Sequence, residues 1–330
     1  MVGSFRFVLA WLVMLSHMPY SPFALNFNLA VSAVILFYFI SGYLMYKSFF
    51  KEEIKDISFI KKTLFFYTKR VLRLFPLYLI VLFLTVLSIY FLGKSEFIAL
   101  LNQDLSIKKI LLNSLLIFNN YVFAPFEIHS LLPHPLIPPT WSLSTEWHFY
   151  LLVPILFLFL RKERKIFYII MIASLIFELN AFSYVGGVFN SDVFGYRYIF
   201  GVLWIFMLGF YVSKNGFDKF IKSIYVFVVV YFLIYGFTFS AHPYVREIFL
   251  AIFITPFIPG LFKIDFKYDK LLGSFSYPVF LSHFLSFYLI EKAGIKPGEL
   301  YFFSVFCLVL FISFVLSIIQ KKIDNIRMKF

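Results

Sequence analysis

The feature that most constrains this chain is a series of apolar runs, each about 20 residues long, that recurs from one end to the other. A helix of that length crosses the hydrocarbon core of a bilayer, which is about 30 Å thick. Only 14% of the 330 residues are charged, against about 25% in a soluble domain, so the solvent for most of this surface is lipid. Inside lipid, a helix satisfies its own backbone polar groups. The sequence therefore predicts an all-α polytopic membrane protein.

Clusters of Lys and Arg between the apolar runs orient them, because such clusters collect in cytoplasmic loops. The strongest clusters are residues 51–73 and 161–165. Placing both inside predicts ten spans with both termini cytoplasmic, near residues 4–20, 29–49, 71–92, 141–160, 166–183, 196–212, 223–240, 246–262, 272–290 and 300–320. The net charge of +13 is divided among these short loops, with no continuous basic stripe, so we do not interpret it as a nucleic-acid surface.

One apolar segment, residues 108–125, does not fit as an eleventh span, because that crossing would move one anchor cluster outside. It also carries three asparagines, Asn113, Asn119 and Asn120. We predict a short re-entrant or interfacial helix here, with 93–107 and 126–139 both extracytoplasmic. Without internal repeats or a soluble appendage, residues 1–330 are predicted to form a single membrane domain.

Two ionisable residues fall inside the first predicted span, Arg6 and His17. Charged groups at this depth cost about 2.5–3.5 kcal/mol on insertion scales, so each marks a candidate functional site. Eleven helical steps return to within about 20° of the starting face and rise roughly 16 Å. We expect both side chains on one face at two depths, with Arg6 toward the cytoplasm. The alternative is an interfacial arginine and a histidine that caps the helix end.

Glu146 lies in a later apolar run and shares a helix face with Ser142 and Tyr150. A carboxylate this close to lipid needs a partner, and an arginine or histidine of another helix is the natural one. The alternative is an acid stabilised by the dipole at the helix start.

Arg70 and Arg73 are predicted to open the third span at the cytoplasmic surface. Guanidinium pairs suit phosphate recognition through charge-assisted hydrogen bonds. The alternative is that they only set topology.

The remaining candidates are weaker. His283 sits in the span near 272–290, where a lone histidine more often packs helices through a hydrogen bond. Four other histidines are assigned to loops or interfaces: His129, His134, His148 and His242. No histidine pair at i, i+4 and no HExxH motif is present, and Cys307 is the single cysteine, so no metal site and no disulfide is predicted.

Five short motifs, in order, resemble the membrane-bound acyltransferase 3 family of bacterial O-acyltransferases that modify surface polysaccharides. They are Arg6–x10–His17; residues 37–42 (FYFISG), ending in Ser41 and Gly42; Arg70 and Arg73 followed by Pro76 and Tyr78; residues 141–147 (WSLSTEW); and Gly273, Ser276 and Tyr277 followed by His283. The motifs cover residues 6–283. One departure is that Phe7 and Val8 replace the small residues that usually follow the first arginine.

The resemblance implies a ten-helix core, which agrees with the span count, without a fused hydrolase-like (SGNH) domain. It implies transfer of an acyl group, most commonly acetyl, from acyl-CoA to a hydroxyl of a glycan: O-antigen of lipopolysaccharide, capsule, exopolysaccharide or peptidoglycan. The protein would reside in the bacterial inner membrane, with membrane lipids, acyl-CoA and the glycan as partners and no further cofactor.

The resemblance also implies residue roles. His17 would be the catalytic base, with Arg6 and Glu146 as further catalytic residues. Donor binding would fall to Arg70 and Arg73. Other pocket residues would be Ser41, Trp141, Ser142, Tyr277 and His283.

Two other functions use the same polar residues. A transporter or flippase for a lipid-linked glycan would use them as a translocation path, but such proteins often show repeated halves, and this sequence shows none. A shuttle that carries the acyl donor to a separate hydrolase-like transferase would keep the face with Arg6 and His17.

Overall fold

A computed structural model describes residues 1–20, 22, 28–53, 57–102, 104–121, 134–182, 191–235 and 244–327, and these residues form helices and no strand. The α-helices are α1 (Val2–His17), α2 (Leu29–Glu53), α3 (Phe59–Leu92), α4 (Ile107–Ser114), α6 (Thr140–Lys162), α7 (Arg164–Ala181), α8 (Ile199–Asn215), α9 (Lys219–Tyr235), α10 (Val245–Ile254), α11 (Ile258–Leu261), α12 (Asp269–Lys292) and α13 (Glu299–Arg327). Shorter turns of helix are η1 (Ala99–Leu101), η3 (Val193–Arg197, a π-helix) and η5 (Thr255–Phe257).

Each predicted span corresponds to helical structure, so the predicted all-α polytopic membrane fold is confirmed. Five helical stretches are long and apolar enough to cross a bilayer on their own: Leu29–Lys51, Phe59–Leu92, Thr140–Lys162, Val193–Asn215 and Glu299–Arg327. Helix α1 is a shorter apolar helix of 16 residues.

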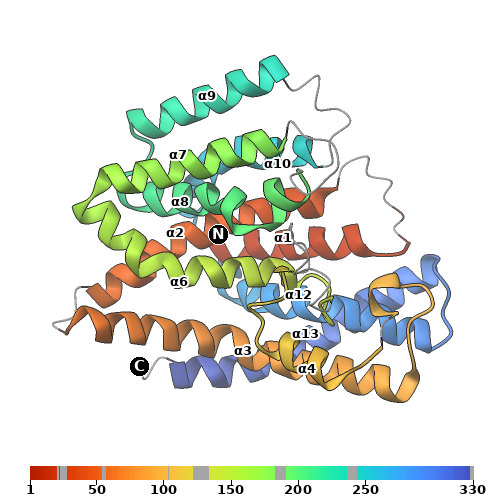
Figure 1. Ribbon diagram of the computed structural model, residues 1–330. Helices are drawn as coiled ribbons and strands as arrows, with labels where there is room; N and C mark the ends of the chain where they lie inside the picture. The colour runs from red at the N-terminus through yellow and green to blue at the C-terminus, as the bar shows by residue number, and fades with distance from the viewer. Residues whose placement is uncertain are drawn as a thin grey trace.

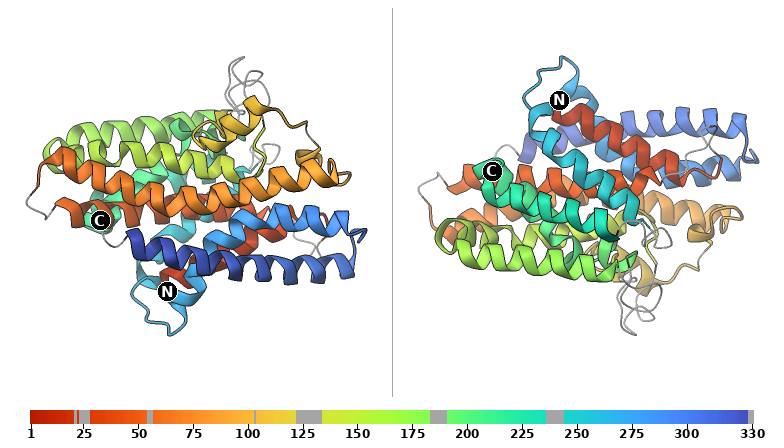
Figure 2. Two further views of the ribbon diagram at one scale, coloured as in Figure 1. Left: turned by 90° about the horizontal axis from the view of Figure 1, so that it is seen from below. Right: turned by 90° about the horizontal axis from the view of Figure 1, so that it is seen from above.

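The helix ends that flank the basic connections gather at one end of the bundle. In Figure 1 the end of α2, the start of α3, the junction of α6 with α7 and the step from α8 to α9 all lie on the left. Helix α13 also ends there, and it packs beside α12 and α3, as Figure 2 shows. This is the arrangement that the topology prediction requires of loops on one side of a membrane.

Two predicted spans differ from the helices that form. Helix α3 begins at Phe59 and not near residue 71, because Ser58 caps it by accepting a hydrogen bond from the Lys61 amide. Its 34 residues extend about 51 Å, well beyond a hydrocarbon core of about 30 Å. Arg70 and Arg73 therefore do not begin this helix but lie about three and four turns inside it.

The predicted span at 246–262 is not one helix. It divides into α10, η5 and α11, because Pro256 and Pro259 lack the N–H that a continuous α-helix needs at those positions.

Glycines allow two pairs of helices to touch. A Cβ atom on Gly42 would collide with the backbone of α8, and one on Gly209 would collide with the backbone of α2. Gly3 of α1 and Gly273 of α12 meet in the same way. Small residues at such crossings are the usual means by which membrane helices approach closely. Gly42 and Gly273 of the sequence motifs are thus packing residues.

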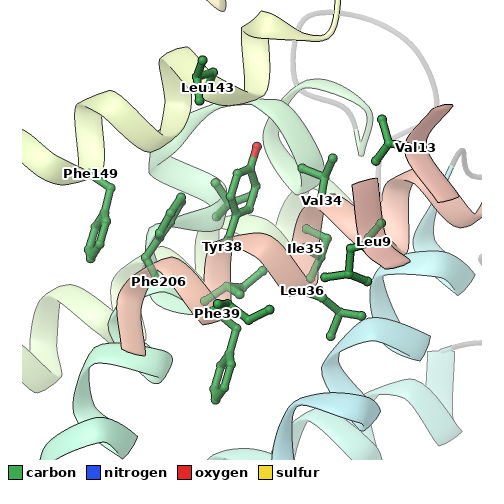
Figure 3. Packing of buried hydrophobic residues seen from close by; sticks show 14 of the residues in the cluster. Leu9, Val13, Val34, Ile35, Leu36, Tyr38, Phe39, Leu143, Phe149 and Phe206 are labelled. Carbon is green, nitrogen blue, oxygen red and sulfur yellow. The ribbon is translucent and has the colours of Figure 1, made fainter. Parts of the chain in front are cut away.

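Aromatic side chains fill the space beside the α2–α8 crossing. Tyr38 of α2 and Phe206 of α8 have ring centroids 4.5 Å apart, and Phe206 stacks on Phe149 of α6 at 4.4 Å. Figure 3 shows Tyr38 rising from α2 with its hydroxyl toward α6, where Leu143 lies. This packing fixes α2 between α6 and α8.

Segment 107–121 contains α4, whose eight residues span about 12 Å and are too few to cross a bilayer. Its asparagines are buried and attach it to neighbouring helices. The Tyr78 hydroxyl of α3 donates to the Asn113 carbonyl at 2.6 Å, and the Asn119 amide donates to the hydroxyls of Tyr78 and Thr140. The loop predicted at 126–139 lies largely outside the described residues, as do His129 and His242.

Candidate active site

The first cavity of the site, named here the Glu146 cavity, is enclosed by α1, α2, α6 and α12 and has a volume of about 50 Å³. Its lining residues are Arg6, Val34, Phe37, Tyr38, Ser142, Leu143, Glu146, Ser276, Tyr277 and Phe280. Four residues named from the sequence therefore meet here: Arg6, Ser142, Glu146 and Tyr277. A space of this size holds more than one water-sized group among polar partners.

The Glu146 carboxylate has a fixed orientation. Its Oε1 accepts a hydrogen bond from the Ser41 hydroxyl at 2.6 Å and one from the Tyr150 hydroxyl at 2.5 Å. Tyr150 lies one turn further along α6, whereas Ser41 comes from α2. The two hydroxyls hold one oxygen, and the carboxylate lines the cavity.

Arg6 lies across the same cavity from Glu146 without bonding to it. No hydrogen bond or ion pair joins its guanidinium to the residues that the structure describes, although the two charges are close enough to interact. The Ser276 hydroxyl donates to the Arg6 carbonyl at 2.9 Å and so fixes α1 against α12. Arg6 and Glu146 thus line one cavity without a direct ion pair between them.

The two arginines of α3 have different environments. Arg70 is buried, with its guanidinium 3.1 Å from the Ser48 hydroxyl and above the Phe66 and Tyr150 rings. Its Nε is buried and has no hydrogen-bond partner in the described part of the chain. Arg73 is only partly buried. Its charge acts on both Arg6 and Arg70, so three arginines of α1 and α3 form one cationic cluster.

Arg327, near the end of α13, extends this cluster, because its charge interacts with those of Arg70 and Arg73. It also pairs with Asp324 at 3.0 Å. No local pattern in the sequence links residue 327 to residues near 70.

The second cavity, named here the His17 cavity, lies at the other end of α1 and has a volume of about 280 Å³. Its lining residues are His17, Asn28, Ala30, Leu100, His134, Pro135, Pro138, Trp141, Tyr196, Arg197 and Tyr244. His17 and Trp141 were named from the sequence, whereas His134 had been assigned to a loop or interface. A cavity of this size is near the lower end of those that hold small ligands.

His17 stacks on His283, with ring centroids 5.6 Å apart and planes inclined by 21°. His283 is fully buried in α12, and its Nδ1 lies 3.3 Å from the Val279 carbonyl one turn back. Within the described residues, Nδ1 of His17 and Nε2 of His283 are buried without hydrogen-bond partners. The two imidazoles are thus brought together from α1 and α12.

One layer of side chains separates the two cavities. Trp141 and Ser142 are neighbours in α6, yet Trp141 lines the His17 cavity and Ser142 lines the Glu146 cavity. Tyr38 lines the Glu146 cavity, and its hydroxyl donates to the carbonyl of Tyr196, which lines the other cavity, at 3.4 Å. Polar groups of α2 and α6 therefore lie between the two cavities.

A sequence model of the acyltransferase domain matches residues 4–319, nearly the whole chain and all of both cavities. The chain belongs to the acyltransferase 3 family. An uncharacterized protein of Aquifex aeolicus (strain VF5) is 33% identical to this acyltransferase 3 protein over an alignment of 209 residues, which covers 58% of this chain and 89% of that protein. No solved structure matches the chain.

This acyltransferase 3 protein also contains a residue pair that the sequence analysis missed. Arg197 forms an ion pair with Asp192 at 2.9 Å, and its guanidinium carbon lies 4.6 Å from the centroid of the Trp141 ring. The Thr145 hydroxyl donates to the Arg197 carbonyl at 2.7 Å. A signal was present, because Arg197 falls inside the span predicted at 196–212, where an ionisable residue is a functional candidate by default.

Proposed function

We propose that this membrane acyltransferase transfers an acyl group, most simply acetyl, from acyl-CoA to a hydroxyl of a lipid-linked or cell-surface glycan. The observation that carries the proposal is the pair of cavities one side-chain layer apart. One is lined by Arg6 and Glu146, and the other by His17. The protein would lie in the bacterial inner membrane with both termini in the cytoplasm.

The cationic cluster supports a phosphate-bearing donor. Arg6, Arg70 and Arg73 interact electrostatically, and Arg70 and Arg73 lie in the half of α3 that begins at the end of the bundle where the basic connections gather. Guanidinium groups bind phosphate oxygens through charge-assisted hydrogen bonds. Arg73 is the more accessible of the two arginines on α3, so we assign it the direct contact. Arg70 would hold the cluster from within.

His17 supplies the general base that acyl transfer needs on the acceptor side. A neutral imidazole can act as general base toward a hydroxyl. In the proposed reaction the acceptor hydroxyl gives its proton to His17 while its oxygen attacks the thioester carbonyl. The carbon–sulfur bond then breaks, the CoA thiolate leaves, and it takes up the proton. The resulting ester remains on the glycan.

The acyl carbonyl of the donor must meet the hydroxyl oxygen of the acceptor. The layer that contains Tyr38 and Trp141 lies between them. Arg6 and Glu146 both line the Glu146 cavity, which we take as the donor side of this layer. We propose that Glu146, held by Ser41 and Tyr150, keeps the Arg6 guanidinium directed at the thioester end of the donor. The developing oxyanion would then meet a positive charge.

Two measurements test the proposal. The purified protein in lipid nanodiscs is given acetyl-CoA, and release of free CoA is followed with and without an extract of cell-surface glycans. Surface glycans from cells with and without the protein are then compared by mass spectrometry, and we expect an acyl mass difference. Unchanged acylation together with a loss of surface glycan would instead favour a flippase.

A further inference from the structure

The lining of the His17 cavity contains basic side chains but no acidic ones among the described residues. The basic groups are the guanidinium of Arg197 and the imidazoles of His17 and His134. Burial, and then the positive charge of Lys109, lower the pKa of the His134 imidazole, so Arg197 is the permanent cation of the lining. A ligand of this cavity therefore meets a guanidinium whose Nε is paired with Asp192, which lies outside the lining, as does Glu247, which accepts from the Asn28 amide.

Arg197 is held in place before any ligand arrives. Its Nε donates to Asp192 at 2.9 Å, and its guanidinium carbon lies 4.6 Å from the centroid of the Trp141 ring and 5.0 Å from that of Tyr196. It ends the π-helical turn η3, a type of turn that occurs often at functional sites. The hydroxyl of Thr145, fully buried in α6, fixes its backbone. A guanidinium positioned in this way loses little conformational freedom when it binds.

The rest of the lining suits a saccharide. Three aromatic side chains, Trp141, Tyr196 and Tyr244, border the cavity beside Arg197. Flat aromatic surfaces pack against the apolar faces of sugar rings, while the tyrosine hydroxyls and Asn28 can exchange hydrogen bonds with sugar hydroxyls. His17 lines the same cavity, so a hydroxyl of a bound sugar can reach the proposed base.

We propose that the His17 cavity is the acceptor subsite and that Arg197, positioned by Asp192 and Trp141, selects a saccharide that carries an anionic group. The group is a carboxylate, as in a uronic acid, or a phosphate, as in a sugar phosphate. Both present paired oxygens to a planar guanidinium fork. This inference rests on the proposed acyl transfer, because it specifies the acceptor of that reaction.

Binding of small sugars tests the inference without any turnover. Purified protein in nanodiscs is titrated, in the absence of acyl-CoA, with methyl glucuronide, glucose 1-phosphate and the neutral methyl glucoside, and dissociation constants are measured by ligand-observed NMR. We expect at least one anionic sugar to bind roughly tenfold or more tightly than the neutral one, because a hydrogen bond to a charged group contributes that much. Comparison of the two anionic sugars separates carboxylate from phosphate recognition.

Variants of Arg197 connect the preference to this side chain. Arg197→Gln should abolish the preference for anionic sugars, measured as the ratio of the dissociation constants of the neutral and anionic sugars. The matched control is Arg246→Gln, an exposed arginine at the start of α10 that does not line the cavity. If Arg197→Gln is not monodisperse, Arg197→Lys carries the test, since it keeps the charge but loses the planar fork and should reduce the preference several-fold.

Equal binding of neutral and anionic sugars by the wild type, or an unchanged preference in the Arg197 variants, would overturn the inference. The outcomes also separate it from the proposed function. Acyl transfer to a neutral sugar with no anionic preference leaves the function standing and removes the inference. Arg197-dependent binding of anionic sugars, with no acyl transfer from acyl-CoA to any sugar, removes the function and leaves an anionic-saccharide site.

Discussion

The Ser41 hydroxyl of α2 donates a 2.6 Å hydrogen bond to Oε1 of Glu146 in α6, across 105 residues of sequence. The same oxygen accepts from Tyr150. Two motifs that look independent in the sequence, FYFISG and WSLSTEW, therefore position one carboxylate. Since the neighbouring Gly42 lets α2 contact α8, the first motif both places the helix and orients the acid.

Ser41→Ala should lower acyl transfer by about tenfold or more, because a hydrogen bond to a charged group contributes about 1.5–3 kcal/mol. The carboxylate would retain Tyr150 as its single donor and turn away from Arg6. We expect the loss in kcat at saturating acetyl-CoA, measured as CoA release by purified protein. The control is Ser274→Ala in α12, an exposed serine whose hydroxyl bonds only to its own helix. Similar rates for the two variants would contradict a role of Ser41 in orienting Glu146.

His17→Ala should reduce transfer by about 10²–10⁴-fold, the usual loss when a general base is removed. Insertion into the membrane and binding of acyl-CoA should be retained, because Arg6 lies at the other end of α1 and Arg70 and Arg73 belong to α3. His148→Ala is the control, since His148 lies outside both cavities and bonds to the Ser144 carbonyl and the Tyr121 hydroxyl. If monodisperse His17→Ala protein transfers acyl groups at a near wild-type rate, His17 is not the general base. The base would then be His283 or Glu146.

Helical periodicity and the cost of charge in lipid were enough to find several site residues from the sequence. The spacing of Arg6 and His17 placed both on α1, and the phase of α6 placed Ser142 on the same face as Glu146. The structure adds that these residues line two cavities and not one. That division depends on Tyr38 reaching the Tyr196 carbonyl, which is a contact between helices and leaves no periodic signal.

Other features of the fold could not be predicted, because they depend on contacts that the local sequence does not indicate. Asn119 made segment 108–125 look too polar for a span, but nothing local indicates that its amide bonds to Tyr78 and Thr140. The basic cluster at 51–73 indicated a loop, whereas the cap at Ser58 starts helix α3 within it. Charge counts identify a side of the membrane, but they do not determine where a helix begins.

The two arginines of α3 should respond differently to substitution. Arg73→Ala should raise the KM for acetyl-CoA and leave the thermal midpoint nearly unchanged, because Arg73 is only partly buried. Arg70→Ala should also lower the thermal midpoint, since it removes a buried side chain that contacts Ser48 and two aromatic rings. Steady-state kinetics with each substrate varied, together with thermal unfolding in nanodiscs, would measure both effects.

Lys61→Ala, an exposed cation on the same helix, controls for loss of positive charge. If Lys61→Ala and Arg73→Ala change the KM for the donor equally, α3 acts only through its general positive field. If Arg73→Ala changes the KM values for donor and acceptor by the same factor, the assignment of a direct contact between Arg73 and the donor is wrong.

Gly42→Ala should destabilise the protein, because the added methyl group would collide with the Phe206 carbonyl of α8. Overpacking of a core costs about 1–3 kcal/mol, and here the obstacle is backbone, which cannot rotate away. Since Ser41 is the adjacent residue, any shift of α2 also lengthens its hydrogen bond to Glu146. We therefore expect both a lower thermal midpoint and less transfer per folded molecule. Gly260→Ala in α11 is the control, because a Cβ there meets nothing within 4 Å and alanine favours helix. If the Gly42→Ala protein is as stable and active as Gly260→Ala, α2 and α8 can move apart at no cost. The close crossing would then not be the feature that holds Ser41 against Glu146.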